Sequence, residues 1–179
     1  MTLAFGGKRP RIDPAAFVAP GARLIGDVEI GPEASIWYNC VVRGDVNRIR
    51  IGARSNIQDG SVVHCDSPKP GEPEGHPTLI GEDVLVGHMA MVHGCVLHDR
   101  AFVGLGAIVM DGCEIESDAM LAAGAMLTPG RRIPSGQLWA GRPAKYVRDL
   151  TAEELAGMRA GVAHYVALAR AHAEQLKGR

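Results

Sequence analysis

The 179-residue sequence has few aromatic residues, almost no net charge and no long apolar run. Only 4% of its residues are aromatic whereas 46% are hydrophobic, so a core must be built mainly from aliphatic side chains. A formal net charge of -1 excludes the broad basic surface that nucleic acids and anionic membranes require. No stretch reaches the ~18 apolar residues of a membrane helix, and Met1 to Arg11 lack a hydrophobic signal region. We therefore expect a soluble, cytoplasmic protein with no nucleic-acid partner.

The four cysteines are Cys40, Cys65, Cys95 and Cys113. Their number is even, yet the chain is longer than the small secreted scaffolds in which cysteine counts imply disulfides. Two of them, Cys40 and Cys113, occupy small-residue positions of the repeat described next. We expect these two to be buried as small hydrophobic side chains.

Large aliphatic residues recur every six positions in two long blocks. The first block is Ile12, Val18, Leu24, Ile30, Ile36 and Val42, and the second is Leu97, Val103, Val109, Ile115, Leu121, Leu127, Ile133 and Trp139. A period of six fits neither one continuous helix nor one continuous strand. It fits short strands separated by tight Gly- and Pro-rich corners, with one aliphatic side chain per strand pointing inward. An ordinary β-sandwich is disfavoured, because its turns come at wider and less regular intervals. The sequence predicts an all-β stack of coils.

Between the two blocks the period continues with breaks. Ile51, Ile57 and Val63 form one run and Ile80, Val86 and Val92 form another, with steps of nine, seventeen and five residues around them. We interpret these breaks as loops or a slipped corner. Since Leu79, Leu85 and Met91 extend the later block backwards without a slip, the frame of the second run stays open.

Two segments depart from the repeat. Residues 66–78 contain four prolines and two glycines, so we predict a loop that leaves the stack. Near the C-terminus, Thr151 and Glu154 make a capping box that predicts a helix to about Leu176. Its apolar stripe should pack on the flank of the stack, in the same chain or in a neighbour. The predicted organisation is a stacked-coil domain over residues 1–148, followed by a helix and tail over 149–179.

Three histidines lie within this repeat. His64 directly follows Val63, and His93 directly follows Val92, so both should project from equivalent positions on the coils. His88 lies two residues after Val86, and adjacent residues of a strand point to opposite faces. His88 should therefore not converge with the other two inside one chain.

That conflict is resolved if metal sites form between copies in a cyclic homo-oligomer. Three histidines with one open position suit a catalytic divalent metal such as zinc, whereas closed structural sites usually include thiolates. Cys65 and Cys95 are the alternative ligands, although alternation argues against Cys65 lying on the same face as His64.

Two segments carry a resemblance to a known family. They are WYNCVVRGDVNRIRIGARSNIQDGSVVHCD, from Trp37 to Asp66, and VGHMAMVHGC, from Val86 to Cys95. Their Arg-Gly-Asp turn, Asn-Ile-Gln-Asp turn and Gly-His-x4-His-Gly motif resemble those of the γ-class carbonic anhydrases. The resemblance extends over roughly residues 12–150 and implies a left-handed parallel β-helix of hexapeptide repeats, with a C-terminal α-helix packed on its flank.

The same resemblance implies a homotrimer with a metal site at each subunit boundary. It assigns His64 and His93 as metal ligands from one subunit and His88 as the ligand from its neighbour. Gln58 matches the residue that hydrogen-bonds the reacting solvent or bicarbonate. The charged set that ties subunits together beside the site corresponds to Arg43, Asp45 and Asp59. The implied cofactor is Zn2+, with Fe2+ and Co2+ as alternatives, since imidazole ligands accept each of them.

The expected activity is therefore that of a carbonic anhydrase, a lyase that reversibly hydrates CO2 to bicarbonate. One departure from the most active members is Val46, which replaces their acidic residue directly after the Arg-Gly-Asp turn. Their glutamate-bearing, proton-exporting loop is not recognisable, and Glu72, Glu74 and His76 in the 66–78 loop are the local substitutes. Two alternatives remain: a metal-dependent ester or thioester hydrolase, and a non-catalytic trimeric metal-binding scaffold that binds a protein partner.

Overall fold

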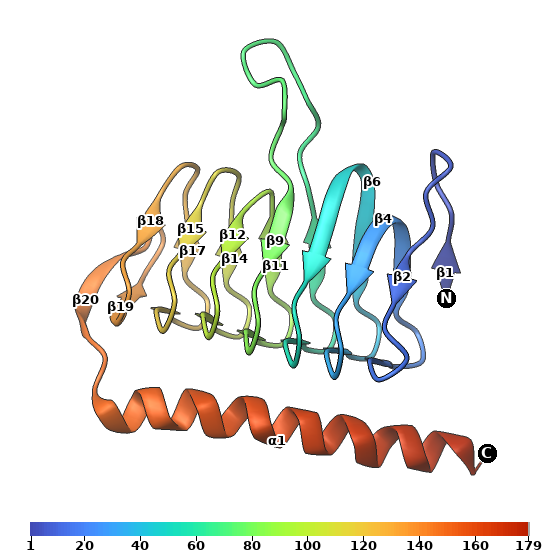
Figure 1. Ribbon diagram of the computed structural model, residues 1–179. Helices are drawn as coiled ribbons and strands as arrows, with labels where there is room; N and C mark the ends of the chain where they lie inside the picture. Colours follow the sequence, from blue (N-terminus) through green and yellow to red (C-terminus); the bar gives the residue numbers. More distant parts are fainter. Residues whose placement is uncertain (179) are drawn as a thin grey trace.

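The computed structural model describes residues 1–178, which form a stack of three-sided coils flanked by one long helix (Figure 1). Strands of successive coils pair in parallel and in register, for example Val86 with Val103 and Val92 with Val109. The protein is a left-handed parallel β-helix, as the family resemblance implies. Each coil has one strand on each of three faces, which we name the helix face, the histidine face and the charged face.

The helix face lies against the C-terminal helix. Its strands are β3 (Phe17–Val18), β5 (Ser35–Ile36), β7 (Asn56–Ile57), β10 (Leu85–Val86), β13 (Phe102–Val103), β16 (Met120–Leu121), β19 (Gln137–Ala140) and β20 (Lys145–Asp149). All pairs in this face are parallel except the last, in which β20 turns back antiparallel to β19. This hairpin forms the C-terminal edge of the helix face.

The other two faces share the long strands β4 (Arg23–Ile30) and β6 (Val41–Ile51), which run through the corner between them. The histidine face contains the first halves of these two strands together with β1 (Thr2–Leu3), β8 (Val62–His64), β11 (Met91–His93), β14 (Ile108–Val109) and β17 (Met126–Leu127). The charged face contains their second halves together with β2 (Arg11–Ile12), β9 (Thr78–Ile80), β12 (Val96–Leu97), β15 (Glu114–Ile115) and β18 (Arg132–Ile133).

The core is a column of the six-residue aliphatic repeat. Fully buried members include Leu24, Ile36, Val63, Leu97, Ile115, Leu121, Leu127 and Ile133. The structure settles the open frame, because Ile80, Val86 and Val92 are buried and pair with core residues of the next coil. Since these interiors are close-packed, shortening one such leucine to alanine costs about 2–5 kcal/mol of stability.

The breaks in the six-residue period correspond to a loop and to altered corners, as the sequence predicts. The nine-residue step lies within β6, whose pairing with β4 changes register between Gly26 and Val28. The seventeen-residue step is the 66–78 loop, which rises from the stack in Figure 1 between β8 and β9. The five-residue step is a shortened corner at Gly94, where φ is +53°.

Helix α1 (Ala152–Lys177) lies along the helix face and contacts β3, β5, β7 and β10 of its own chain. Its N-terminus has the predicted capping box, in which Thr151 and Glu154 each accept a backbone hydrogen bond from the other. His172 fixes the helix near its C-terminal end, through a 2.8 Å hydrogen bond with Tyr38. In residues 1–178, no helix is long and apolar enough to span a membrane.

Candidate metal centre

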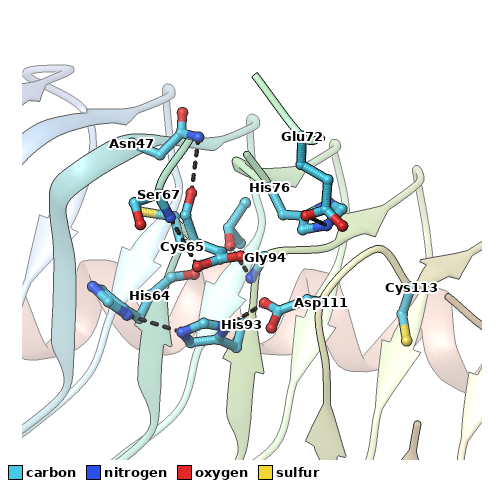
Figure 2. Close-up of polar contacts among 12 residues, drawn as sticks. Asn47, His64, Cys65, Ser67, Glu72, His76, His93, Gly94, Asp111 and Cys113 are labelled. Atoms are coloured by element: carbon cyan, nitrogen blue, oxygen red, sulfur yellow. Dashed lines mark hydrogen bonds and ion pairs between the residues drawn. The ribbon is translucent and has the colours of Figure 1, made fainter. Parts of the chain in front are cut away.

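His64 and His93 lie side by side on the histidine face. They end the neighbouring strands β8 and β11 and are paired in register. The Nδ1 atom of His64 is 3.0 Å from the Nε2 atom of His93, as the dashed line in Figure 2 marks. For two nitrogens bound to one tetrahedral zinc ion at about 2.0–2.1 Å, the expected separation is about 3.3 Å. The pair therefore has nearly the spacing of two ligands of one ion.

Each of these rings is held from behind by a carboxylate. Asp45 Oδ1 lies 2.9 Å from His64 Nε2, and Asp111 Oδ1 lies 2.5 Å from His93 Nδ1. In metal sites, a carboxylate on the far ring nitrogen fixes the tautomer and orients the other nitrogen toward the ion. The two nitrogens that face each other are thus the ones available for a ligand.

Asp111 did not emerge from the sequence as a site residue. It lies at the corner after β14, one coil away from His93, and it reaches the ring across Gly94. A Cβ atom at Gly94 would collide with Asp111 and His76, so only glycine fits there. The sequence would have indicated Asp111 only if the alignment of successive coils had been known, because that alignment places Asp111 beside Gly94.

The pKa of His64 is lowered, chiefly because its burial disfavours the charged ring and also because Arg43 lies nearby. Burial acts to raise the pKa of Asp45, but hydrogen bonds from His64 and Arg43 outweigh it and lower that pKa. His64 is therefore held as a neutral imidazole against an ionised carboxylate. This is the protonation state that a metal ligand needs.

His88 lies at another corner, between the helix face and the histidine face. Its Nδ1 is 2.9 Å from Asp59 Oδ2, so this ring too is backed by a carboxylate. Its Nε2 lies 3.3 Å from the hydroxyl of Tyr165 on helix α1. As the alternation argument predicts, His88 does not join His64 and His93: in residues 1–178, the only three such groups within 4.8 Å of one another lie elsewhere.

The remaining predicted residues divide between the same two corners. Arg43 pairs in register with His64 and donates to Asp45 at 2.5 Å. Gln58 directly precedes Asp59, is 4% exposed, and donates through Nε2 to Asn56 Oδ1 at 3.1 Å. The structure therefore presents two half-sites. The paired half-site is His64, His93, Arg43, Asp45 and Asp111, and the single half-site is His88, Asp59, Gln58 and Tyr165.

The group within 4.8 Å consists of Asp66, Glu72 and His76, in the 66–78 loop. The ammonium of Lys69 lies among these side chains, 2.9 Å from Asp66 and 3.2 Å from Glu72. A cation of the protein itself thus already offsets part of the negative charge of the two carboxylates. The donor set fits a metal less well than the histidine pair does.

The four cysteines are free and buried. Burial raises the pKa of Cys40 to about 11 and also raises the pKa values of Cys65 and Cys95. A thiol must lose its proton to bind a metal, so these environments oppose ligation. The alternative ligands Cys65 and Cys95 are therefore disfavoured against the imidazoles.

Comparison with known proteins places this architecture in a family. A carbonic anhydrase from Geobacillus kaustophilus is 44% identical over 158 residues, which cover 88% of this chain and 83% of that protein. The chain belongs to the γ-class carbonic anhydrase family. The mitochondrial γ carbonic anhydrase 1 of Arabidopsis thaliana is 48% identical over 169 residues, which cover 94% of this chain. The chain spans about three fifths of that plant protein, 61% of its length.

A solved structure shares the whole fold of this γ-class family member. The hexapeptide transferase family protein from Anaplasma phagocytophilum aligns with a TM-score of 0.89 and 46% identity, covering 96% of this chain and 97% of the other. No model of a protein family matches the chain.

Proposed function

We propose that this protein is a carbonic anhydrase that reversibly hydrates CO2 to bicarbonate, at a metal held between two copies of the chain. The observation that carries the proposal is the set of three carboxylate–histidine pairs: Asp45 with His64, Asp111 with His93, and Asp59 with His88. In each pair the carboxylate takes one ring nitrogen and leaves the other to face a metal, for which the Tyr165 hydroxyl must release His88 Nε2. The γ-class relatives named carbonic anhydrase support the choice of reaction.

The outward side chains of the three faces indicate where the second copy binds. On the helix face, α1 covers Phe17, Ser35, Asn56 and Leu85, all of which are buried. On the charged face, the outward ladder is Arg11, Glu29, Arg50, Leu79, Val96, Glu114 and Arg132, and its charged members form ion pairs with one another. These two faces need no partner.

The histidine face differs from both. Its outward ladder begins at Arg23 and continues through five apolar residues paired in register, Val41, Val62, Met91, Ile108 and Met126. No element of the described chain covers this ladder, and the adjoining corner exposes 71% of Met89 and 53% of Leu105. Contiguous exposed apolar surface beside polar groups is typical of an interface. We therefore propose that a second copy of the chain covers this face.

Such packing brings unlike corners of two copies together. The paired half-site lies at one edge of the histidine face, and the single half-site lies at the opposite edge. A head-to-tail contact in a closed ring would join the paired half-site of one copy to His88 of the next. In a homotrimer, which the family resemblance implies, three such contacts close the ring.

The chain supplies defined groups for the reaction. Zn2+ is the proposed ion, with Fe2+ and Co2+ as alternatives, and when bound it supplies a nucleophilic hydroxide at neutral pH. Asp45, Asp111 and Asp59 hold the three rings in their ligating tautomers. One of the two N–H donors of Gln58 is used by Asn56, and its carbonyl oxygen is available to accept a hydrogen bond from the reacting solvent.

Proton release is the step of the reaction for which we identify no dedicated side chain. Val46 follows Asp45 and is 42% exposed, but its side chain has no exchangeable proton. We propose that protons leave to dissolved buffer and that turnover rises with buffer concentration until another step limits it.

The direct experiment is CO2 hydration by protein purified without oxygen and reconstituted with Zn2+ or Fe2+. We expect acceleration above buffer that disappears in the His93→Ala variant together with the bound metal. Full metal content without acceleration would exclude the reaction while keeping the site. A panel of acyl-CoA thioesters, assayed alongside, distinguishes hydrolase activity of the same metal centre.

A further inference from the structure

A cavity lies between helix α1 and the helix face, on the side away from the histidine face. Its volume is about 490 Å3, within the range of small-molecule sites. Leu85 and Phe102 form its floor, and Met158, Val162 and Val166 of the helix form its inner wall. None of the groups proposed for CO2 hydration lines it.

The mouth of the cavity has a particular sequence pattern. Along the edge of helix α1, Arg159, Ala163, Ala167 and Arg170 follow one another at helical spacing and all line the cavity. The small side chains of Ala163 and Ala167 leave space for the opening of the cavity. Arg159 and Arg170 lie at the two ends of this opening. The opposite rim contains Arg54 and Arg100, which come from the corner turns of the coils.

The arginines differ in how firmly they are engaged. Arg54 binds Asp83 through two hydrogen bonds of 2.6 and 2.8 Å. Arg100 likewise binds both oxygens of Asp118, each at 2.9 Å. Arg159 shares this same carboxylate at a longer 3.6 Å. Arg54 also binds Glu82 at 2.9 Å and Arg170 pairs with Glu33, so acidic and basic groups balance around the mouth as a whole. Arg159 is the guanidinium held least firmly, because Arg100 already takes both oxygens of Asp118.

Arg159 lies where an apolar cavity opens to solvent. The guanidinium of Arg159 is the weakly held member, since 61% of its side chain is exposed. An anionic group at this point could take a charge-assisted hydrogen bond without breaking the Arg100–Asp118 pair. The chemistry of the cavity therefore favours a ligand with an apolar tail and a negative head.

We propose that this cavity binds a medium-chain aliphatic carboxylate. Its head lies at Arg159, and its tail lies on Phe102 and Leu85 beneath Val162. The site is separate from the histidines, so binding requires neither the metal nor the CO2 reaction.

The test is titration calorimetry of the full-length protein with decanoate below its micellar range. We expect saturable binding of about one molecule per chain. Decanol lacks the carboxylate and the Arg159→Gln variant lacks the guanidinium of the proposed ionic contact. Decanol binding to the parent, and decanoate binding to Arg159→Gln, should each be about tenfold weaker. Ala163→Trp fills the opening and should abolish saturable binding. Ala160→Trp puts the same ring on the exposed side of the helix and should bind as the parent does.

Two further variants keep the outcome unambiguous. His93→Ala should bind decanoate as the parent does. If decanoate instead bound through its carboxylate to the metal, this variant would lose the binding. Ala167→Phe is a second way of filling the opening, in case Ala163→Trp does not fold. Absence of saturable binding, equal affinity for decanol, or parent-like binding by a folded filled variant would each overturn the proposal.

Discussion

His64 and His93 come from strands one coil apart, and their rings meet with 3.0 Å between Nδ1 of the first and Nε2 of the second. Parallel strands paired in register bring equivalent side chains to adjacent positions along the stack. The six-residue repeat thus converts two histidines 29 residues apart into a pair of neighbours. Their far nitrogens are held by Asp45 and Asp111, so the pair is oriented by the chain itself.

The first prediction concerns Asp111. The Asp111→Asn variant should keep the fold and lose about 10- to 100-fold in metal affinity, because an amide holds the His93 tautomer less firmly than a carboxylate does. Competition with a chelator of known affinity measures the change. Asp66→Asn is the matched control, since it makes the same substitution in the loop cluster with Lys69. Metal loss in the control alone would assign the ion to the loop.

The second prediction concerns assembly. Ile108 lies in the middle of the apolar ladder on the histidine face, and an Ile108→Lys variant places a charge where the second copy should pack. We expect a particle near the 19.0 kDa of one chain, with little bound metal. Light scattering and metal analysis on the same sample measure both. Val96→Lys makes a comparable change on the charged face and should leave assembly intact. An assembled, metal-loaded Ile108→Lys protein would contradict the proposed interface.

The third prediction concerns pH and helix α1. Hydrogen bonds from Arg148 and from the backbone of Thr151 lower the pKa of Glu154 to about 2, from an ordinary value of 4.5. A folded-state pKa below the unfolded one stabilises the protein above about pH 4.5, and this stabilisation is lost as the pH falls toward 2. The melting temperature of the parent should exceed that of Glu154→Gln at neutral pH, with the gap closing in acid. A gap independent of pH would show that the carboxylate charge has no such role.

Much of the fold could be predicted because the repeat is local and regular. Aliphatic residues six apart fix the inward positions, and the Thr151–Glu154 capping box fixes the start of the helix. The frame near Val86 stayed open because both Leu85 and Val86 are apolar. Helix α1 buries Leu85 from outside, so hydrophobicity alone could not show which of the two points inward.

The site could be predicted in part for a similar reason. The positions of His64, His88 and His93 relative to the core residues were enough to separate His88 from the other two. Asp111 was missed because it reaches His93 from the next coil through a corner, and its contact depends on the space above Gly94. Such contacts depend on how corners stack, which the period of the aliphatic residues does not determine.

The central claim, that one metal is held by histidines of two copies, is tested most directly by mixing two inactive chains. His64→Ala and His88→Ala should each bind almost no metal alone. When both are produced together in equal amounts, a site is complete wherever the paired half-site of a His88→Ala chain meets His88 of a His64→Ala chain. Random assembly into a closed ring makes this about one quarter of the sites. Recovery of about that fraction of bound metal, with CO2 hydration in proportion, is the predicted result. No recovery in mixed assemblies would contradict the account, because sites within single chains cannot complement one another.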